Sequence, residues 1–172
     1  MKGYLPLGSW RIFGAPVQVN WLAVLLMLAL LVVLGRHPLL IGLSLCAYLG
    51  ITLLHEAGHA WVVRRLGYRP FGIYLGFLHG RCVYEAPRSL KHDCLIAWGG
   101  VAAQLAVALP LILLALFTGI GRAGLPGIVV KYFGYLNLLI ALINLLPLAA
   151  LDGSKAWRLL PILWAERRAA VR

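Results

Sequence analysis

The chain has 172 residues, of which 62% are hydrophobic and only 12% are charged. A soluble domain carries about twice that share of charged residues, so the composition excludes an ordinary soluble enzyme and predicts an integral membrane protein. The net charge of +11 does not indicate nucleic-acid binding, because the basic residues lie between apolar segments rather than on one soluble face.

Four apolar stretches predict four transmembrane helices, since each is close to the ~20 residues that cross a bilayer as a helix. They run over about residues 19–35, 39–63, 95–118 and 128–151. No small-residue cleavage site follows the first stretch, so we expect it to stay in the protein. One integral membrane domain over residues 1–172 is expected, with its core at about 40–155.

The basic residues of the loops predict the orientation. If the stretches cross alternately, thirteen Lys and Arg residues lie on the side of the N-terminus and three on the other side. Because basic loops stay in the cytoplasm, both termini are predicted to be cytoplasmic, in the plasma or inner membrane. The larger set is Lys2, Arg11, Arg64, Arg65, Arg69, Arg81, Arg88, Lys91, Lys155, Arg158, Arg167, Arg168 and Arg172; the smaller is Arg36, Arg122 and Lys131.

The second stretch contains the sequence His55-Glu56-Ala57-Gly58-His59. Histidine and glutamate are costly in hydrocarbon, so their presence there is a functional hypothesis. On a helix, residues four apart project from one face about 6 Å apart, so both imidazoles can bind one metal ion while the glutamate acts on water. In an alternative interpretation, the histidines are buried helix residues whose ring nitrogens pair with backbone carbonyls or with neighbouring helices.

The segment of residues 67–91 is too polar and too rich in glycine for a span. Its apolar residues alternate up to a turn signal at His79-Gly80, which predicts a short β-hairpin at the membrane interface. An irregular amphipathic loop fits the same residues equally well. The alternating residues are Phe71, Ile73, Leu75 and Phe77.

The fourth stretch closes with Asn144-Leu-Leu-Pro147-Leu-Ala-Ala-Leu-Asp152-Gly153. A catalytic zinc site takes three protein ligands, and a carboxylate is a common third ligand beside two imidazoles, so Asp152 is the best candidate. Pro147 disrupts the helix, so the chain from Asn144 onward can be unwound where it lines a polar cavity. In the alternative, Asp152 caps the tail helix, because Asp-Gly-Ser-Lys resembles a helix start.

The tail of residues 154–172 carries Trp157, Leu160 and Trp164 on one helical face with basic residues around them. This pattern predicts a basic helix that lies on an anionic membrane surface.

Together, the histidine motif and the Asn144–Gly153 segment resemble the two hallmark motifs of the site-2 protease family of intramembrane zinc metalloproteases. The resemblance implies a membrane all-α fold of about four transmembrane helices, with a short interfacial β-hairpin between the second and the third. It also implies one Zn²⁺ per chain and hydrolysis of a peptide bond in or near a transmembrane segment of a membrane-protein substrate in the lipid bilayer. The implied roles are zinc ligands for His55, His59 and Asp152, catalytic base for Glu56, and a polar group near the substrate or oxyanion for Asn144.

Some residues depart from the family pattern. Many relatives have a Gly-Pro pair followed by asparagine in the third span, where this chain has Gly99-Gly100 and Gln104. Neither Gln104 nor His79, which stands at a hairpin position where relatives often have glycine, is assigned a role. The chain is expected to be a minimal form without a PDZ or CBS domain, and no oligomeric state is predicted.

Two other classes of protein stay open. A membrane protein that binds or transports divalent metals also places His, Glu and Asp in its spans, although it would not need Glu56 between the histidines. A catalytically inactive relative could serve as a binding subunit, and the departures at Gly100 and Gln104 are the residues that favour it.

Overall fold

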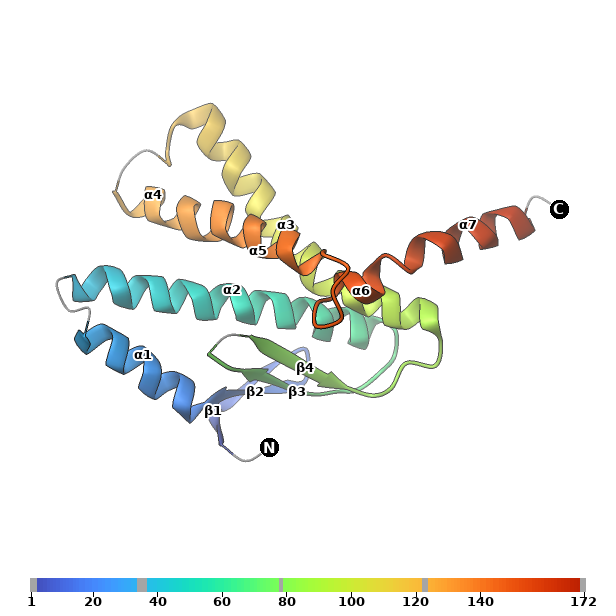
Figure 1. Ribbon diagram of the computed structural model, residues 1–172, viewed down its shortest axis with the longest axis horizontal. Coiled ribbons are helices and arrows are strands. Elements are labelled where there is room, and N and C mark those ends of the chain that lie inside the picture. Colours follow the sequence, from blue (N-terminus) through green and yellow to red (C-terminus); the bar gives the residue numbers. More distant parts are fainter. Residues whose placement is uncertain (1–2, 34–36, 78, 122–123, 171–172) are drawn as a thin grey trace.

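The computed structural model describes residues 3–33, 37–77, 79–121 and 124–170, and shows a mostly helical chain with one β-sheet (Figure 1). The strands are β1 (Tyr4–Ile12), β2 (Ala15–Asn20), β3 (Pro70–Leu75) and β4 (Gly80–Tyr84). The helices are α1 (Trp21–Val33), α2 (Pro38–Arg65), α3 (Leu90–Thr118), α4 (Gly124–Val129), the π-helix η1 (Val130–Leu136), α5 (Asn137–Asn144), α6 (Gly153–Ala156) and α7 (Leu159–Ala170).

Among the described residues, three helical segments are long and apolar enough to cross a membrane: α2, α3 and the continuous run Gly124–Asn144 that α4, η1 and α5 form. At most 28% of the residues in their most apolar windows are buried, as expected where the solvent is lipid. The first of the four predicted spans, over residues 19–35, corresponds to a shorter apolar helix. Residues 19 and 20 belong to β2, and the 13 residues of α1 cover only about 20 Å of the ~30 Å hydrocarbon core.

Part of the evidence for the predicted orientation lies outside the described residues. This applies to residues 34–36, at the end of the first apolar stretch, and to the basic residues Lys2, Arg36, Arg122 and Arg172.

The predicted hairpin is present but belongs to a larger sheet, so the expectation of an all-α fold was wrong. Strands β3 and β4 pair antiparallel, with Ile73 opposite Cys82. The strand order is β1-β2-β3-β4, and β2 pairs parallel to β3. The register of β3 and β4 shifts between Pro70 and Gly72, and Phe71 at this irregularity is 53% exposed. The simple alternation expected for β3 therefore breaks at its start.

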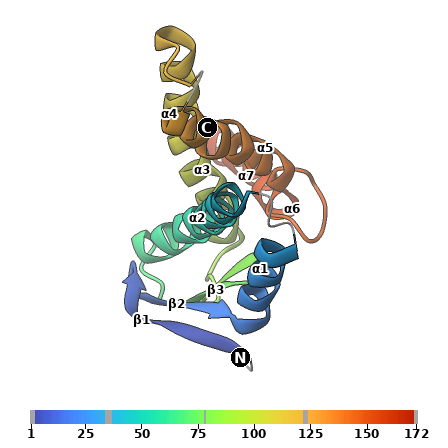
Figure 2. The same cartoon turned by 90° about the vertical axis from the view of Figure 1, so that its left-hand side faces the viewer.

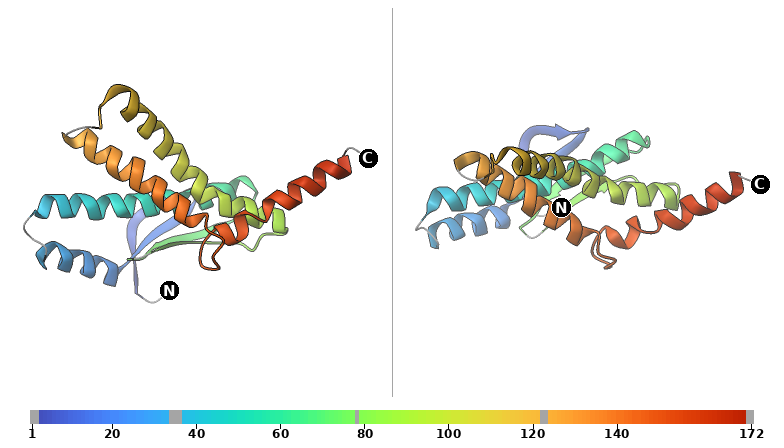
Figure 3. Two further views of the ribbon diagram at one scale, coloured as in Figure 1. Left: turned by 45° about the horizontal axis from the view of Figure 1, so that its top comes forward. Right: turned by 90° about the horizontal axis from the view of Figure 1, so that it is seen from above.

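Helix α2 lies at the centre, between the sheet on one side and α3 with α5 on the other (Figures 1 and 2). Buried Val17, Ile73 and Leu75 of the sheet form one apolar cluster with Ala60 of α2. Helix α1 runs beside α2, and α7 extends beyond the ends of α2 and α3 (Figure 3). No described contact of α7 reveals whether it lies on a membrane surface, so that role stays a prediction.

Two glycines set the distance between α2 and α3. A Cβ atom on Gly58 would lie 2.3 Å from the carbonyl oxygen of Gly99, and one on Gly99 would lie 2.7 Å from the carbonyl oxygen of Gly58. Small residues of this kind allow membrane helices to approach until their backbones touch. Because Gly58 directly precedes His59, this contact packs the face of α2 that carries the histidines against α3.

We predict that Gly58→Ala destabilises the protein by about 1–3 kcal/mol, the usual cost of overpacking. Gly42→Ala in the same helix is the matched control, because its Cβ would meet only Leu31 Cδ1 at 3.7 Å. Thermal unfolding in detergent, followed by circular dichroism, measures both variants. Equal unfolding midpoints for the two variants would contradict the proposed close contact.

Candidate metal centre

Three ligand-type atoms converge between α2 and the segment that follows α5. Asp152 Oδ2 lies 2.9 Å from His55 Nε2 and 3.3 Å from His59 Nε2, and the two Nε2 atoms are 3.0 Å apart. A tetrahedral site with bonds of about 2.0–2.1 Å separates its ligand atoms by about 3.3 Å. The three side chains, which are the predicted ligand set, could therefore hold one metal ion.

The partners of the other ring nitrogens decide which lone pairs are free. His59 Nδ1 lies 2.7 Å from the carbonyl oxygen of Ile96. A carbonyl only accepts, so Nδ1 carries the proton and Nε2 of the neutral ring has a free lone pair. His55 Nδ1 similarly donates to Gln104 Oε1 at 2.9 Å. The alternative, in which the ring nitrogens pair with backbone carbonyls or with neighbouring helices, thus applies to Nδ1 of both histidines, whereas both Nε2 atoms face Asp152.

The donor set fits a divalent metal ion. Two imidazole lone pairs and one carboxylate oxygen face one another at 2.9–3.3 Å, and three acceptors at this distance repel unless a cation lies between them. His55 and His59 are 9% and 7% exposed, so water screens this repulsion poorly. Nitrogen and oxygen ligands in this combination suit zinc and its neighbours in the transition series.

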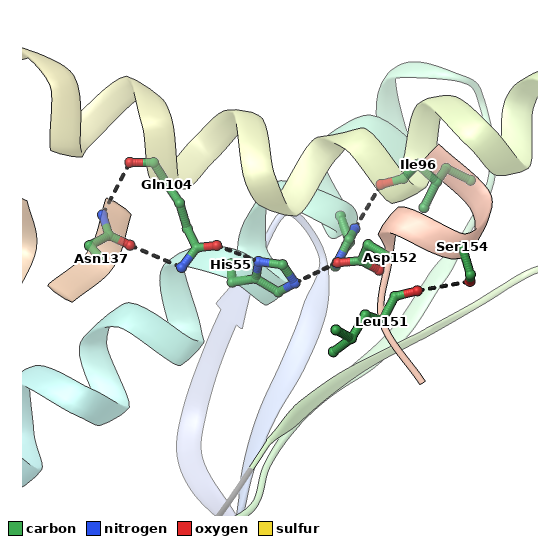
Figure 4. A network of polar contacts seen from close by, with 8 residues as sticks. His55, Ile96, Gln104, Asn137, Leu151, Asp152 and Ser154 are labelled. Carbon is green, nitrogen blue, oxygen red and sulfur yellow. Dashed lines mark hydrogen bonds and ion pairs between the residues drawn. The ribbon is translucent and has the colours of Figure 1, made fainter. Parts of the chain in front are cut away.

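Asp152 stands at the capping position of α6 but does not cap it. Its side chain makes no hydrogen bond to the first turn of α6 and instead faces the histidines (Figure 4). The helix before it ends at Asn144, as Pro147 predicted, and the chain returns through a turn that Ser154 closes by donating to the carbonyl of Leu151 at 2.8 Å.

Two tryptophans hold the Asp152 segment in place. Trp98 Nε1 of α3 donates to the carbonyl oxygen of Ala156 at 2.9 Å. Trp157 Nε1 donates to the carbonyl oxygen of Leu145 at 2.6 Å, and the two indoles pack edge to face. Helix α6 is therefore tied both to α3 and to the end of α5, which fixes the side from which Asp152 reaches the histidines.

Glu56 lies beside the three-atom cluster and is not part of it. Its side chain is 5% exposed and lies against the backbone of β4, since a Cβ atom on Gly80 would lie 2.6 Å from both Cγ and Oε1 of Glu56. A carboxylate at this position could exchange protons with a water molecule at the cluster.

A cavity of about 790 Å³ opens onto these groups. Asn144, at the end of α5, lines it together with the cluster and with the edge strand β4. Cys82 of β4 also faces the cavity, and burial, with a smaller effect of the Glu56 charge, raises the pKa of its thiol to about 12. Without a bound metal ion, the thiol is therefore protonated at neutral pH. His79 is exposed and also borders the cavity.

The departures from the family pattern contact the histidines directly. A Cβ atom on Gly100 would lie 2.6 Å from His55 Cε1 and from His59 Nε2, so only glycine lets α3 pass this close. Gln104 is fully buried, and its Nε2 donates to Asn137 Oδ1 at 3.0 Å (Figure 4). Sequence reasoning missed Asn137 and gave Gln104 no role; the available signal was an isolated amide within each of two apolar stretches.

Comparison with known proteins identifies relatives along the whole chain, although no protein-family model matches. Two curated proteins named "Putative zinc metalloprotease Rip3", from Mycobacterium tuberculosis strains Erdman and H37Rv, are each 31% identical over 188 aligned positions. The alignment covers 100% of this chain and 47% of each relative, so the chain spans about half the length of the curated relatives it matches.

A solved structure shares the fold. The site-2 protease from Methanocaldococcus jannaschii superposes with a TM-score of 0.72 and 21% identity, over 90% of this chain and 70% of that one. The chain therefore has the fold of this site-2 protease, is similar along its whole length to the mycobacterial relatives, and brings its two motifs together at one cluster.

Proposed function

We propose that the protein is a zinc-dependent endopeptidase that cleaves a peptide bond in or near a transmembrane segment of a membrane protein. The observation that carries the proposal is the convergence of His55, His59 and Asp152 beside the Glu56 carboxylate, at a cavity between membrane-spanning helices. Three protein ligands that leave one coordination position open are typical of catalytic zinc. The printed name of the mycobacterial relatives, zinc metalloprotease, supports the same metal and reaction.

The residues around the cluster suit peptide hydrolysis. Zinc bound there would supply a Lewis acid that polarises the substrate carbonyl and acidifies water. Glu56 accepts a proton from the attacking water and passes it to the nitrogen of the leaving amine. Asn144 lines the same cavity, and its amide donates a hydrogen bond to the oxyanion, a contribution of about 3 kcal/mol in other hydrolases.

The substrate is proposed to bind as an extended strand. The peptide bonds of a transmembrane helix are hidden in its own hydrogen bonds, so the segment to be cut must unwind and find new partners. Strand β4 is an edge of the sheet, and its residues Gly80, Arg81 and Cys82 line the cavity. An unwound segment that pairs with this edge would add a fifth strand beside Glu56.

The cavity is proposed to open toward the cytoplasm, with both termini on that side. In the described part of the chain, most basic residues lie at the end of α2 and α3 that carries the sheet and α6 (Figure 1). By the positive-inside rule this end is cytoplasmic. These residues are Arg11, Arg64, Arg65, Arg69, Arg81, Arg88, Lys91, Lys155, Arg158, Arg167 and Arg168, against Lys131 at the other end.

The two rival functions have less support. A transport path needs successive ion sites, and the described residues hold a single cluster of three potential ligands. The departures that favoured an inactive relative, Gly100 and Gln104, instead pack against and hydrogen-bond the histidines.

We predict that the purified protein binds one zinc ion per chain and that Asp152→Asn weakens binding by more than the 10- to 100-fold that loss of an outer-shell partner typically costs. Asp93→Asn is the matched control, because the ion pair of Asp93 with Lys155 is solvent-exposed and contributes little. Elemental analysis gives the stoichiometry and chelator competition gives the affinity. Wild-type affinity in Asp152→Asn would remove the carboxylate from the ligand set.

We predict that Glu56→Gln keeps zinc but lowers the cleavage rate of a transmembrane peptide by about 10²- to 10⁴-fold, the usual contribution of a general base. Glu166→Gln should cleave at the wild-type rate, because Glu166 is exposed, pairs with Lys91, and neither residue lines the cavity. The assay compares zinc-loaded proteins in detergent or proteoliposomes. An active Glu56→Gln variant would reject the role of Glu56 as the base.

We predict that a cysteine at position 37 is labelled from outside intact cells and that a cysteine at position 170 is not. Both are introduced as His37→Cys and Ala170→Cys in a chain whose Cys46, Cys82 and Cys94 are replaced by Ala. A membrane-impermeant maleimide provides the measurement, with lysed cells as the control for reactivity. Labelling at position 170 but not at 37 would reverse the proposed topology.

A further inference from the structure

We infer that Gln104 is a positioning residue that holds His55 with Nε2 toward the metal, and that Asn137 sets the direction in which Gln104 points. The inference rests on the proposed function, because it concerns the same metal centre. It is carried by a chain of hydrogen bonds that runs from backbone carbonyls through two amides to one imidazole (Figure 4).

The two histidines are held in different ways. His59 Nδ1 donates to the carbonyl of Ile96, a group that can only accept. His55 Nδ1 faces the amide of Gln104, and an amide can present either its oxygen or its nitrogen. If the amide of Gln104 turned end for end, its NH₂ group would face Nδ1 and favour the tautomer with the proton on Nε2. That tautomer cannot bind a metal through Nε2.

Asn137 removes this ambiguity. Its Nδ2 donates to the backbone oxygens of Gln104 at 3.1 Å and of Phe133 at 3.2 Å. Both partners only accept, so the nitrogen of Asn137 must face them and Oδ1 must face Gln104. Gln104 Nε2 then donates to Oδ1 at 3.0 Å, which leaves Gln104 Oε1 toward His55 Nδ1 at 2.9 Å. The backbone carbonyls of Gln104 and Phe133 thus determine, through the side chains of Asn137 and Gln104, which ring nitrogen of His55 carries the proton.

The surroundings make this arrangement rigid. Gln104 and Asn137 are both 0% exposed, so no solvent is available to replace a lost hydrogen bond. Asn137 begins α5 directly after the π-helix η1, and its side chain donates back to Phe133 within that π-helix. Irregular turns of this kind are frequent at functional sites. The pair is also uncharged, so it adds no buried carboxylate beside the carboxylates of Asp152 and Glu56.

Gln104→Met and Asn137→Leu test the inference, with Val101→Ala as a matched control. Val101 is buried in the same helix and has no part in the hydrogen-bond chain. Chelator competition measures zinc affinity in the purified full chain, and ¹⁵N-histidine NMR of the zinc-saturated protein follows the ring Nδ1–H protons. His59 is an internal reference, because a backbone carbonyl holds its ring.

We expect Gln104→Met to weaken zinc binding by about 10- to 100-fold, as for other outer-shell partners, and to abolish the protected Nδ1–H signal of His55 while that of His59 persists. Asn137→Leu should weaken zinc binding less, because Oε1 is still present but no longer fixed. If Gln104→Met does not fold, the result for Asn137→Leu decides the test. Val101→Ala should keep both signals and bind zinc within about threefold of wild type.

The possible results separate a failure of the positioning role of Gln104 from a failure of the proposed function. Wild-type zinc affinity and an intact His55 signal in Gln104→Met, or in Asn137→Leu when it alone folds, would overturn the positioning role. Equal weakening in Val101→Ala, or loss of the His59 signal together with that of His55, would also overturn it, because the effect would then be general loss of structure. A wild-type protein that binds no zinc would instead contradict the proposed function.

Discussion

The structure depends on three acceptor atoms that are held about 3 Å apart within a largely buried site. Two imidazole nitrogens and a carboxylate oxygen at this distance repel one another, and the surrounding protein gives them little solvent to weaken that repulsion. A fold that keeps such a cluster must be rigid at every contact that supports it, and a cation bound among the three atoms would offset their repulsion. The remaining features of the site follow from this requirement for rigidity.

Helix α3 provides most of that rigidity. Along one face it contacts α2 backbone to backbone at Gly99, passes the imidazoles at Gly100, and supplies the Ile96 carbonyl and the Gln104 amide that direct their rings. The same helix holds the Asp152 segment through Trp98. The histidines of α2 and the Asp152 segment are therefore both positioned by contacts with α3. Small residues where α2 and α3 cross allow these contacts inside a membrane.

The sequence was sufficient for the local parts of the site and insufficient for the distant ones. The spacing of His55 and His59 within one helix places both on one face, so periodicity alone predicted their pairing. Asp152 was ambiguous because the residue that starts α6 is also the residue that faces the histidines, and only the fold shows that its side chain makes no capping bond. The roles of Glu56 and Asn144 remain predictions. Strand β2 overlaps the first apolar stretch only at residues 19 and 20, and it pairs parallel to β3, whose residues lie 56 positions further along the chain (Val17 opposite Ile73). The roles of Gln104 and Asn137 could not be predicted from the sequence, because a single amide in an apolar helix produces no periodic pattern.

X-ray absorption at the zinc edge of the zinc-loaded protein tests the central claim most directly, because it counts the atoms bound to the metal. Two imidazole nitrogens at about 2.0–2.1 Å and oxygen from a carboxylate and a water at about 2.0–2.2 Å are predicted, with a total of four ligands. The imidazole scattering should fall to that of one ring in His59→Ala. A sulfur shell at about 2.3 Å, or a shell of oxygen atoms without imidazole, would contradict the proposed centre.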